Sequence, residues 1–237
     1  MTGRFRIIDL QDVREGDLAR VGRKALHLGV MMRAGFPVPR GFVIPTDVCE
    51  EAIRSSGEQI ELDEQLQAAI IAAYRARGFQ WVAVRSSAIL EDLRHASFAG
   101  IYTTRVNVAS NAELIQAVVE CLRSLQAPRT ALYRQQVGLE ENGCGPGMAV
   151  VVQEMVDAEV SGVIYTLNPV TFSRDECVVN SVFGLGEPLV SGRVPGDTFR
   201  VNREGRVLEA RIVEKDATLT PAQLRDLVDA GIALEAF

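Results

Sequence analysis

The sequence lacks an excess of positive charge. Its 237 residues carry 25 Lys and Arg against 31 Asp and Glu, which gives a formal net charge of -6. Nucleic acids and anionic membrane surfaces are bound through a positive field, so this balance argues against both as general partners. Any phosphate-bearing ligand must therefore be held by a few local cations.

Long apolar runs are also missing. Stretches such as Met148–Val152 fall far short of the roughly 20 apolar residues that a membrane helix needs. Met1–Gln11 shows no apolar core of a signal peptide. With 47% hydrophobic and 24% charged residues the chain can bury a core, and we expect a cytoplasmic protein.

Cysteine and histidine are scarce and show no metal-ligand spacing. The four cysteines are widely scattered: Cys49, Cys121, Cys144 and Cys177. Without a C-x-x-C pair they predict neither a zinc site nor a disulfide framework, and reduced thiols are expected. The two histidines, His27 and His95, stand alone, so no metal-binding residue is predicted.

Several nucleotide and hydrolase motifs are absent as well. No G-x-x-x-x-G-K-[ST] run occurs, which disfavours a P-loop, and no G-x-S-x-G elbow is present. Gly184 and Gly186 lack the third glycine and the strand-turn-helix context of a dinucleotide fingerprint. A nucleotide, if bound, requires another kind of site.

What is present is a mixture of helical and extended patterns that predicts an α+β fold. Helices are expected over 22–34, 61–77, 112–125, 129–137 and 221–237, the last with Thr220 as N-cap. A further helix is expected after Thr46, also as N-cap. Strands are expected over 5–8, 42–44, 81–84, 102–108, 148–155, 162–166, 176–183 and 198–201.

The pattern of expected helices and strands changes near residue 146. Helices and short strands alternate before it, whereas β-rich runs separated by turn residues follow it. We therefore expect two subdomains, 1–145 and 146–237. The sequence stops at Phe237 inside an apolar pattern, which indicates a truncated chain or an interrupted reading frame at least as readily as a true terminus.

Two segments in the first half suggest phosphate binding. Lys24 follows Gly22 in the opening turn of an expected helix, where backbone N–H groups and the helix dipole favour anions. Arg85 follows an apolar strand and precedes a loop of small residues that includes Ser97 and Gly100. Such a loop lets amides approach a polyphosphate, and Arg offers a planar fork of donors. A solvated lysine and an ordinary hairpin with an exposed arginine are the alternatives.

Two segments in the second half suggest nucleotide contacts. Gln153, Met155 and Val156 lie at the end of a buried strand and supply the amide and apolar groups that an adenine slot needs. Glu187 closes the glycine turn 183–187, where it could support a nucleotide or magnesium. A core strand and a simple strand turn are the alternatives.

Four ordered blocks, 21–46, 82–104, 150–171 and 183–199, together resemble one family. They are similar to the N-terminal nucleotide-binding domain of phosphoenolpyruvate synthases, pyruvate, phosphate dikinases and rifampin phosphotransferases. The resemblance implies an ATP-grasp fold in which two α+β subdomains clasp ATP. In that family a histidine on a separate swivelling domain accepts the phosphoryl group and carries it to pyruvate or a drug.

The resemblance also implies roles for individual residues. Arg85 would be catalytic, at the transferring phosphoryl group. The nucleotide contacts would come from Lys24, Arg85, Ser97, Gly100, Thr104, Gln153, Met155, Val156 and Glu187. ATP and Mg²⁺ are the implied ligands.

The chain departs from the family pattern in two ways. It has Gly22-Arg23-Lys24 where relatives usually show Gly-Gly-Lys. It also lacks the D-I-E-W and L-Q-S-R-P type strands that hold magnesium and the terminal phosphates, together with the phosphohistidine and substrate domains. We therefore expect a portion of a phosphoenolpyruvate synthase-like enzyme that is catalytically incomplete alone. A rifampin-type phosphotransferase fragment and a non-catalytic nucleotide-binding module are the alternatives.

Overall fold

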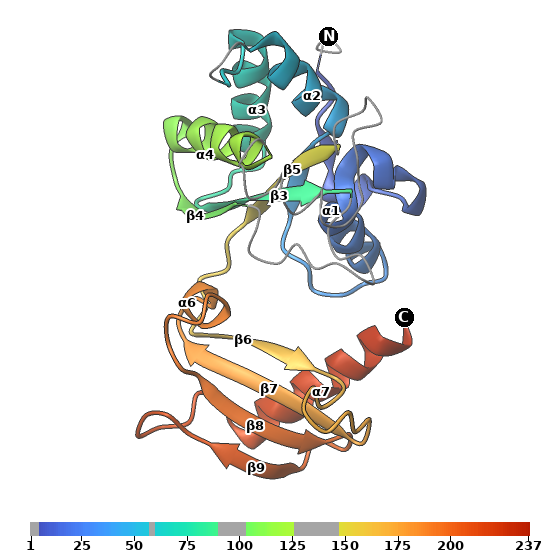
Figure 1. Ribbon diagram of the computed structural model, residues 1–237, viewed down its shortest axis with the longest axis vertical. Coiled ribbons are helices and arrows are strands. Elements are labelled where there is room, and N and C mark those ends of the chain that lie inside the picture. The colour runs from blue at the N-terminus through green and yellow to red at the C-terminus, as the bar shows by residue number, and fades with distance from the viewer. Residues whose placement is uncertain (1–4, 57–59, 90–102, 126–146) are drawn as a thin grey trace. The chain divides into compact units, whose positions relative to one another are not determined.

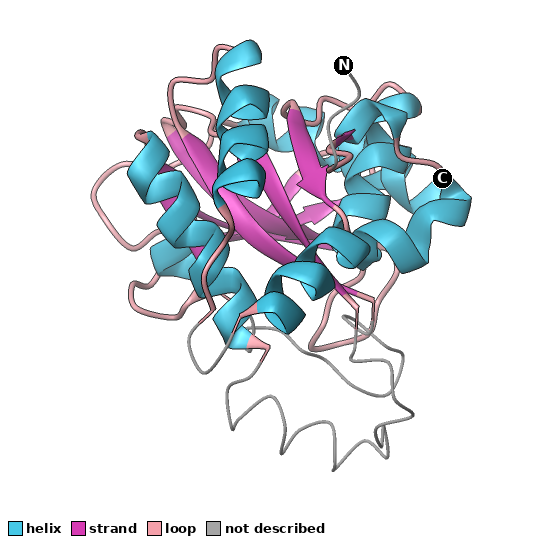
Figure 2. Ribbon diagram, turned by 90° about the horizontal axis from the view of Figure 1, so that it is seen from above, coloured by secondary structure: helices cyan, strands magenta, loops and turns pink. Residues whose placement is uncertain are grey.

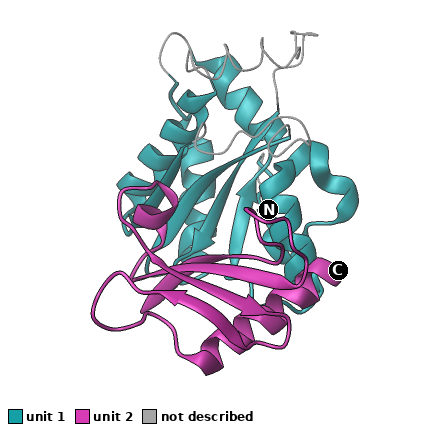
Figure 3. Ribbon diagram, turned by 60° about the horizontal axis from the view of Figure 1, so that its bottom comes forward, with its two compact units in different colours: residues 1–156 teal, residues 157–237 magenta. Residues whose placement is uncertain are grey.

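The computed structural model describes residues 5–56, 60–89, 103–125 and 147–237 (Figure 1). The expected helix over 129–137 and the loop with Ser97 and Gly100 lie outside the described residues. The chain forms two compact units, Met1–Val156 and Asp157–Phe237 (Figure 3). Each is described by itself.

The first unit is built on an antiparallel sheet with strand order β1-β2-β5-β3-β4. Its strands are β1 (Ile8–Asp9), β2 (Gly41–Ile44), β5 (Met148–Glu154), β3 (Val82–Ala88) and β4 (Thr104–Val108). Strand β5 pairs with β2 on one side and β3 on the other, with Val151 opposite Val43 and Arg85. A strand paired on both sides and buried on both faces needs an almost continuous apolar run, which 148–152 provides.

Helices cover both faces of this sheet (Figure 2). One face packs against α1 (Leu18–Arg33), whose Val21 and Ala25 join Val43 and Val151 in one core cluster. The other face packs against α2 (Thr46–Ser55), α3 (Glu64–Ala76) and α4 (Asn111–Ser124). Short 3-10 turns, η1 (Leu10–Asp12) and η2 (Glu15–Asp17), precede α1.

The second unit is an antiparallel sheet with order β6-β7-β8-β9 and one long helix. Its elements are β6 (Val160–Tyr165), β7 (Glu176–Phe183), α6 (Glu187–Val190), β8 (Asp197–Asn202), β9 (Val207–Arg211) and α7 (Pro221–Ala236). Leu224 and Val228 of α7 pack with Val179 and Phe199 in one core cluster. The expected N-cap of α7 is confirmed, because Thr220 Oγ1 accepts from Gln223 N at 3.3 Å.

The structure corrects several expectations. Strand β3 continues to Ala88, so Arg85 lies within the strand and not at its end. The two serines that follow it are fully buried, and β5 pairs with both. Thr46 is the first residue of α2 and not its N-cap, since its hydroxyl donates to Ala19 O at 2.8 Å.

Three strand expectations also change. The first strand is Ile8–Asp9 and not 5–8, and β9 was not expected at all. Strand β5, which the sequence texture grouped with the second subdomain, lies at the centre of the first sheet, so the compact units divide after Val156 and not after residue 145.

Candidate functional site

Polar side chains gather on the α1 face of strands β3, β4 and β5. Arg85 lies opposite Thr104 on one side and Val151 on the other, and Gln153 lies opposite Ala83. Directly opposed residues of an antiparallel pair share a face, as do residues two apart in a strand. Because Val151 packs in the α1 core cluster, Arg85, Thr104 and Gln153 all belong to the α1 face.

A buried glutamine, Gln153, supports the side chain of Arg85 through a hydrogen bond. Arg85 Nη1 donates to Gln153 Oε1 at 3.4 Å, and Gln153 Nε2 donates to Pro39 O at 3.1 Å. Gln153 is 6% exposed, so a satisfied amide at this depth has a fixed orientation. Both ends of the amide are engaged, which makes Gln153 a support for Arg85 in this structure.

A kink in α1 places Lys24 beside the same strand. Gly22 has non-helical backbone angles, φ 72 and ψ 171, within the helix. Lys24 lies in the first turn after this kink, and its Nζ donates to Ser86 O at 2.9 Å. The ammonium group of Lys24 thus lies at Ser86, the residue that follows Arg85 in β3, although Lys24 and Arg85 are far apart in the sequence.

Sequence reasoning assigned no role to Ser87, which the structure places at this kink. Its Oγ donates to Val21 O at 2.8 Å and accepts from Ala25 N at 3.0 Å. The only signal in the sequence is a pair of serines that follows Arg85 at the end of an apolar run. Buried hydroxyls need partners, but their spacing does not reveal that the partners lie in α1.

The end of β5 offers an apolar surface. Val156 is 58% exposed and Trp81 is 42% exposed, while Met155 is half-buried. Met155 N donates to Trp81 O at 3.0 Å. Glu154 forms a two-point ion pair with Arg40, at 2.8 and 3.0 Å. The side chains of Met155 and Val156 are therefore the parts of this strand end that a flat apolar group could meet.

Glu187 lies in the second unit. It begins α6 after a turn in which Gly184 has φ 73, and its carboxylate pairs with Arg193. Of the predicted site residues, Lys24, Arg85, Thr104 and Gln153 thus share one face of the first sheet. Ser97 and Gly100 lie outside the described residues.

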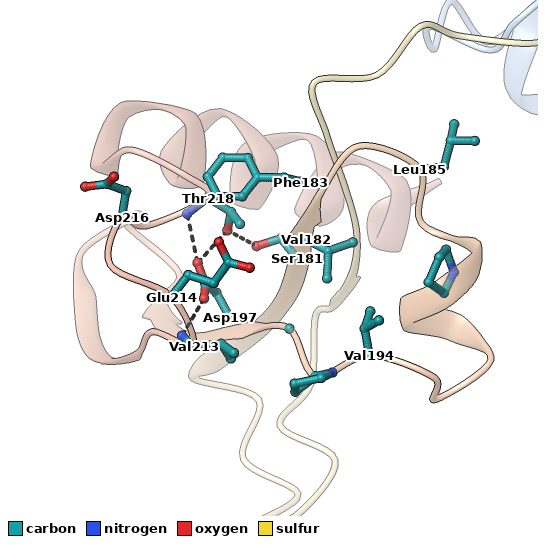
Figure 4. Close-up of a pocket in the computed structure, with 13 residues that line it drawn as sticks. Ser181, Val182, Phe183, Leu185, Val194, Asp197, Val213, Glu214, Asp216 and Thr218 are labelled. Atoms are coloured by element: carbon teal, nitrogen blue, oxygen red, sulfur yellow. Dashed lines mark hydrogen bonds between the residues drawn. The ribbon is translucent and has the colours of Figure 1, made fainter.

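A pocket of about 240 Å³ is formed within the second unit (Figure 4). At its base Asp197 accepts from Val213 N at 2.8 Å, Thr218 N at 2.8 Å and Thr218 Oγ1 at 2.9 Å. Ser181 Oγ lies 2.7 Å from Thr218 Oγ1. These contacts tie β8 to the segment before α7, so Asp197 has a structural role.

The ionisation of Asp197 follows from these contacts. Burial by itself raises the pKa of this carboxyl, but the amides of Val213 and Thr218 and the Thr218 hydroxyl outweigh it, so its pKa lies below the usual value. The carboxylate is therefore ionised at neutral pH.

Among the residues that the structure describes, no group of three or more His, Cys, Asp or Glu could hold a metal ion. In the same part of the chain, no helix combines the length and the apolar character required to cross a membrane.

The fold and the site define a class. An α+β chain that holds a lysine and an arginine against one strand, beside the renewed start of a helix, has the groups that bind the phosphates of a nucleotide. Residues 50–231 match the family model of the pyruvate phosphate dikinase AMP/ATP-binding domain. The chain belongs to this family, and the expected α+β fold class of the ATP-grasp type is confirmed.

Curated relatives agree with this assignment. The chain is 35% identical to a phosphoenolpyruvate synthase of Aeropyrum pernix, over 90% of this chain and 30% of the relative. It is 38% identical to a probable phosphoenolpyruvate synthase of Archaeoglobus fulgidus, over 90% and 33%. It is 36% identical to a rifampicin phosphotransferase of Streptomyces sviceus, over 88% and 28%. The chain thus spans a third or less of the length of these relatives.

Proposed function

We propose that this chain is the ATP-binding portion of a dikinase-type phosphotransferase similar to phosphoenolpyruvate synthase. The whole enzyme would transfer a phosphoryl group from ATP to a histidine on a separate domain, and onward to pyruvate or a similar acceptor. The observation that carries the proposal is the convergence of Lys24 and Arg85 on one segment of β3, in a chain of the AMP/ATP-binding family.

The proposed roles follow from charge and position. Lys24 and Arg85 bind the phosphates, and Arg85 acts at the transferring group, because phosphoryl transfer depends on positioned cations that stabilise redistributing negative charge. Thr104, directly opposite Arg85 at the start of β4, acts with Ser97 and Gly100 in covering the phosphates.

The remaining contacts concern the base and the second unit. Met155 and Val156 provide the apolar surface for adenine. Gln153 contributes to the same adenine site and also supports Arg85 through its hydrogen bond. Glu187 is proposed as a nucleotide contact from the second unit.

The proposal also includes Mg²⁺ as a ligand and a cytoplasmic location. ATP is expected to bind with Mg²⁺, but no described residue is proposed as a metal ligand. A cytoplasmic location is supported by three buried, unpaired cysteines, Cys49, Cys121 and Cys177, because reduced thiols are typical of the cytosol. We propose neither nucleic acid nor membrane as a partner.

A rifampin-type phosphotransferase is the second candidate. The identity to the Streptomyces sviceus rifampicin phosphotransferase, 36%, lies between those to the two synthases, 35% and 38%, so this portion is compatible with either acceptor. A non-catalytic nucleotide-binding module is the third reading, and it shares the same ATP site.

The ATP site can be tested by calorimetry on the 237-residue chain with ATP and Mg²⁺. Lys24→Ala and Arg85→Ala should each weaken binding about 10- to 100-fold, the loss expected for a charge-assisted hydrogen bond to phosphate. Arg105→Ala is the matched control, since Arg105 lies on β4 opposite Val84, on the other face of the sheet, where it pairs with Glu120 of α4 at 3.0 Å.

The outcomes separate the possibilities. Binding that both site variants weaken and the control leaves unchanged supports the proposal. Failure of the folded, unchanged chain to bind ATP refutes it for this portion, and equal weakening by Arg105→Ala would show a nonspecific charge effect.

A further inference from the structure

We propose that Ser87 is a positioning residue for phosphate binding, because its hydroxyl completes the interrupted start of the helix that carries Lys24. This inference rests on the proposed function. It assigns a role to a residue that contacts neither the phosphates nor the base, and that acts through Lys24.

The hydroxyl occupies the place of one helical hydrogen bond. In an uninterrupted α-helix the N–H of Ala25 would donate to the C=O of Val21, four residues earlier. Here Ser87 Oγ accepts from Ala25 N at 3.0 Å and donates to Val21 O at 2.8 Å. One hydroxyl has one proton to donate and lone pairs to accept, so it satisfies both orphaned groups. Insertion of a side chain into the ladder is a recognised cause of a kink.

Gly22 makes this insertion possible. A Cβ at Gly22 would lie 2.0 Å from Ser87 O, so the backbones of α1 and β3 approach more closely than any side chain permits. Gly22 also has φ 72 and ψ 171, a combination that is essentially restricted to glycine. The kink and the close approach to β3 therefore depend on each other.

Ser87 acts as an N-cap supplied from another element. An N-cap side chain accepts from the N–H of the second or third helical residue. Gly22 precedes the renewed helix and has no side chain, and Ala25 is the third residue after it. The oxygen of Ser87 takes that place and is fully buried, where an unmade bond would be costly.

This cap fixes the cations of the site relative to each other. Lys24 lies within the capped turn, and its Nζ donates to the carbonyl of Ser86, the neighbour of Ser87. Arg85 is two residues before Ser87 on the same strand. One hydroxyl thus joins the turn of Lys24 to the strand of Arg85, and a preorganised pair of cations binds phosphate at a lower entropic cost.

The test compares ATP with adenosine, which lacks phosphates. In Ser87→Ala the dissociation constant for ATP should rise about tenfold, as expected for the loss of one buried hydrogen-bonding group. The constant for adenosine should stay within about twofold of the unchanged chain. Ser124→Ala is the matched control, since it also removes a buried hydroxyl, which donates to Cys121 O in α4, and it should change neither constant.

Ser87→Cys provides a second variant if the alanine variant does not fold, because sulfur is only a weak donor and acceptor. It should weaken ATP and spare adenosine in the same way. If the dissociation constant of the Ser87 variant for ATP stays within twofold of that of the unchanged chain while Lys24→Ala still weakens binding, the role of Ser87 is refuted and the proposed function is not. Equal weakening of ATP and adenosine shows a merely structural residue. If the unchanged chain binds no ATP, the proposed function fails first, and this role with it.

Discussion

At the scale of single residues, Gly22 controls how closely α1 approaches β3. Its φ of 72 and ψ of 171 strain any other residue, and a Cβ would lie 2.0 Å from the carbonyl oxygen of Ser87. We expect Gly22→Ala to destabilise the first unit by about 3 kcal/mol or more, since strain and a backbone clash add. Urea unfolding monitored by the single tryptophan, Trp81, measures it.

Gly35→Ala is the control for this substitution. Gly35 has φ 89, but a Cβ there would meet nothing within 4 Å, so only the conformational cost of about 1 kcal/mol remains. Equal losses of stability for the two variants would show that the contact between α1 and β3 at Gly22 leaves room for a methyl group.

Arg23 carries an unsatisfied group. Its Nε is buried without a hydrogen-bond partner among the described residues. We expect Arg23→Met to be neutral or stabilising by up to about 1 kcal/mol, because it removes a desolvated donor while the apolar stem still packs. Arg20→Met is the control on the same helix, since it gives up an exposed pair with Asp17. A loss above 1 kcal/mol for Arg23→Met in thermal unfolding would contradict the expectation.

The charged candidates for the site could be proposed from the sequence, whereas the residues that hold them in place could not. Lys24 and Arg85 could be proposed as phosphate ligands because a cation in the first turn of a helix, or next to an apolar run and a loop of small residues, suits an anion. Ser87 and Gln153 are buried, and their partners Val21 and Pro39 lie in distant segments. Local patterns do not encode such pairings.

At the scale of elements, Asp197 connects β8 to the segment that leads into α7. Three donors from Val213 and Thr218 surround its carboxylate. Asp197→Asn replaces one acceptor oxygen by a donor, which cannot satisfy the amides, so we expect a loss of about 1–3 kcal/mol. Hydrogen exchange of the β8 amides at pH 7 measures it.

The same carboxylate predicts a pH dependence of stability. Because the folded-state pKa of Asp197 lies below its usual value, the carboxylate stabilises the fold fully above the unfolded pKa, about 3.9. This contribution is lost as the pH falls through the lower, folded pKa. The stability difference between the unchanged chain and Asp197→Asn should therefore shrink below about pH 4. A difference that is constant from pH 6 to pH 3 would exclude Asp197 as its source.

Elements with strong local signals were predictable, and those defined by distant partners were less so. A helix over 221–237 was expected because Thr220 is a suitable N-cap before a helical apolar pattern, and the structure adds a capping box with Gln223. Strand β9 was missed because its side chains are mostly exposed and it lies at the sheet edge, where no apolar alternation is required. The length of β3 was underestimated because its serines are satisfied by backbone groups of other segments.

At the scale of the whole molecule, the division into units was less predictable than the fold class. Residues 148–154 share a β-rich texture with the strands that follow, so the sequence grouped them together. Their ladder partners are β2 and β3, however, which lie far earlier in the chain. Only this long-range pairing shows that the strand completes the first unit.

The two units have separate cores, which predicts separate stabilities. The clusters around α1 and around α2, α3 and α4 contain only residues of the first unit, and that around α7 only residues of the second. Gly22→Ala should therefore accelerate hydrogen exchange of amides such as Val151 and leave Phe199 unchanged, while Asp197→Asn should do the reverse. Mass spectrometry of exchanged peptides resolves both units in one sample. If either variant accelerated both sets equally, the chain would unfold as one cooperative body, and the losses at Gly22 and Asp197 could not be assigned to separate units.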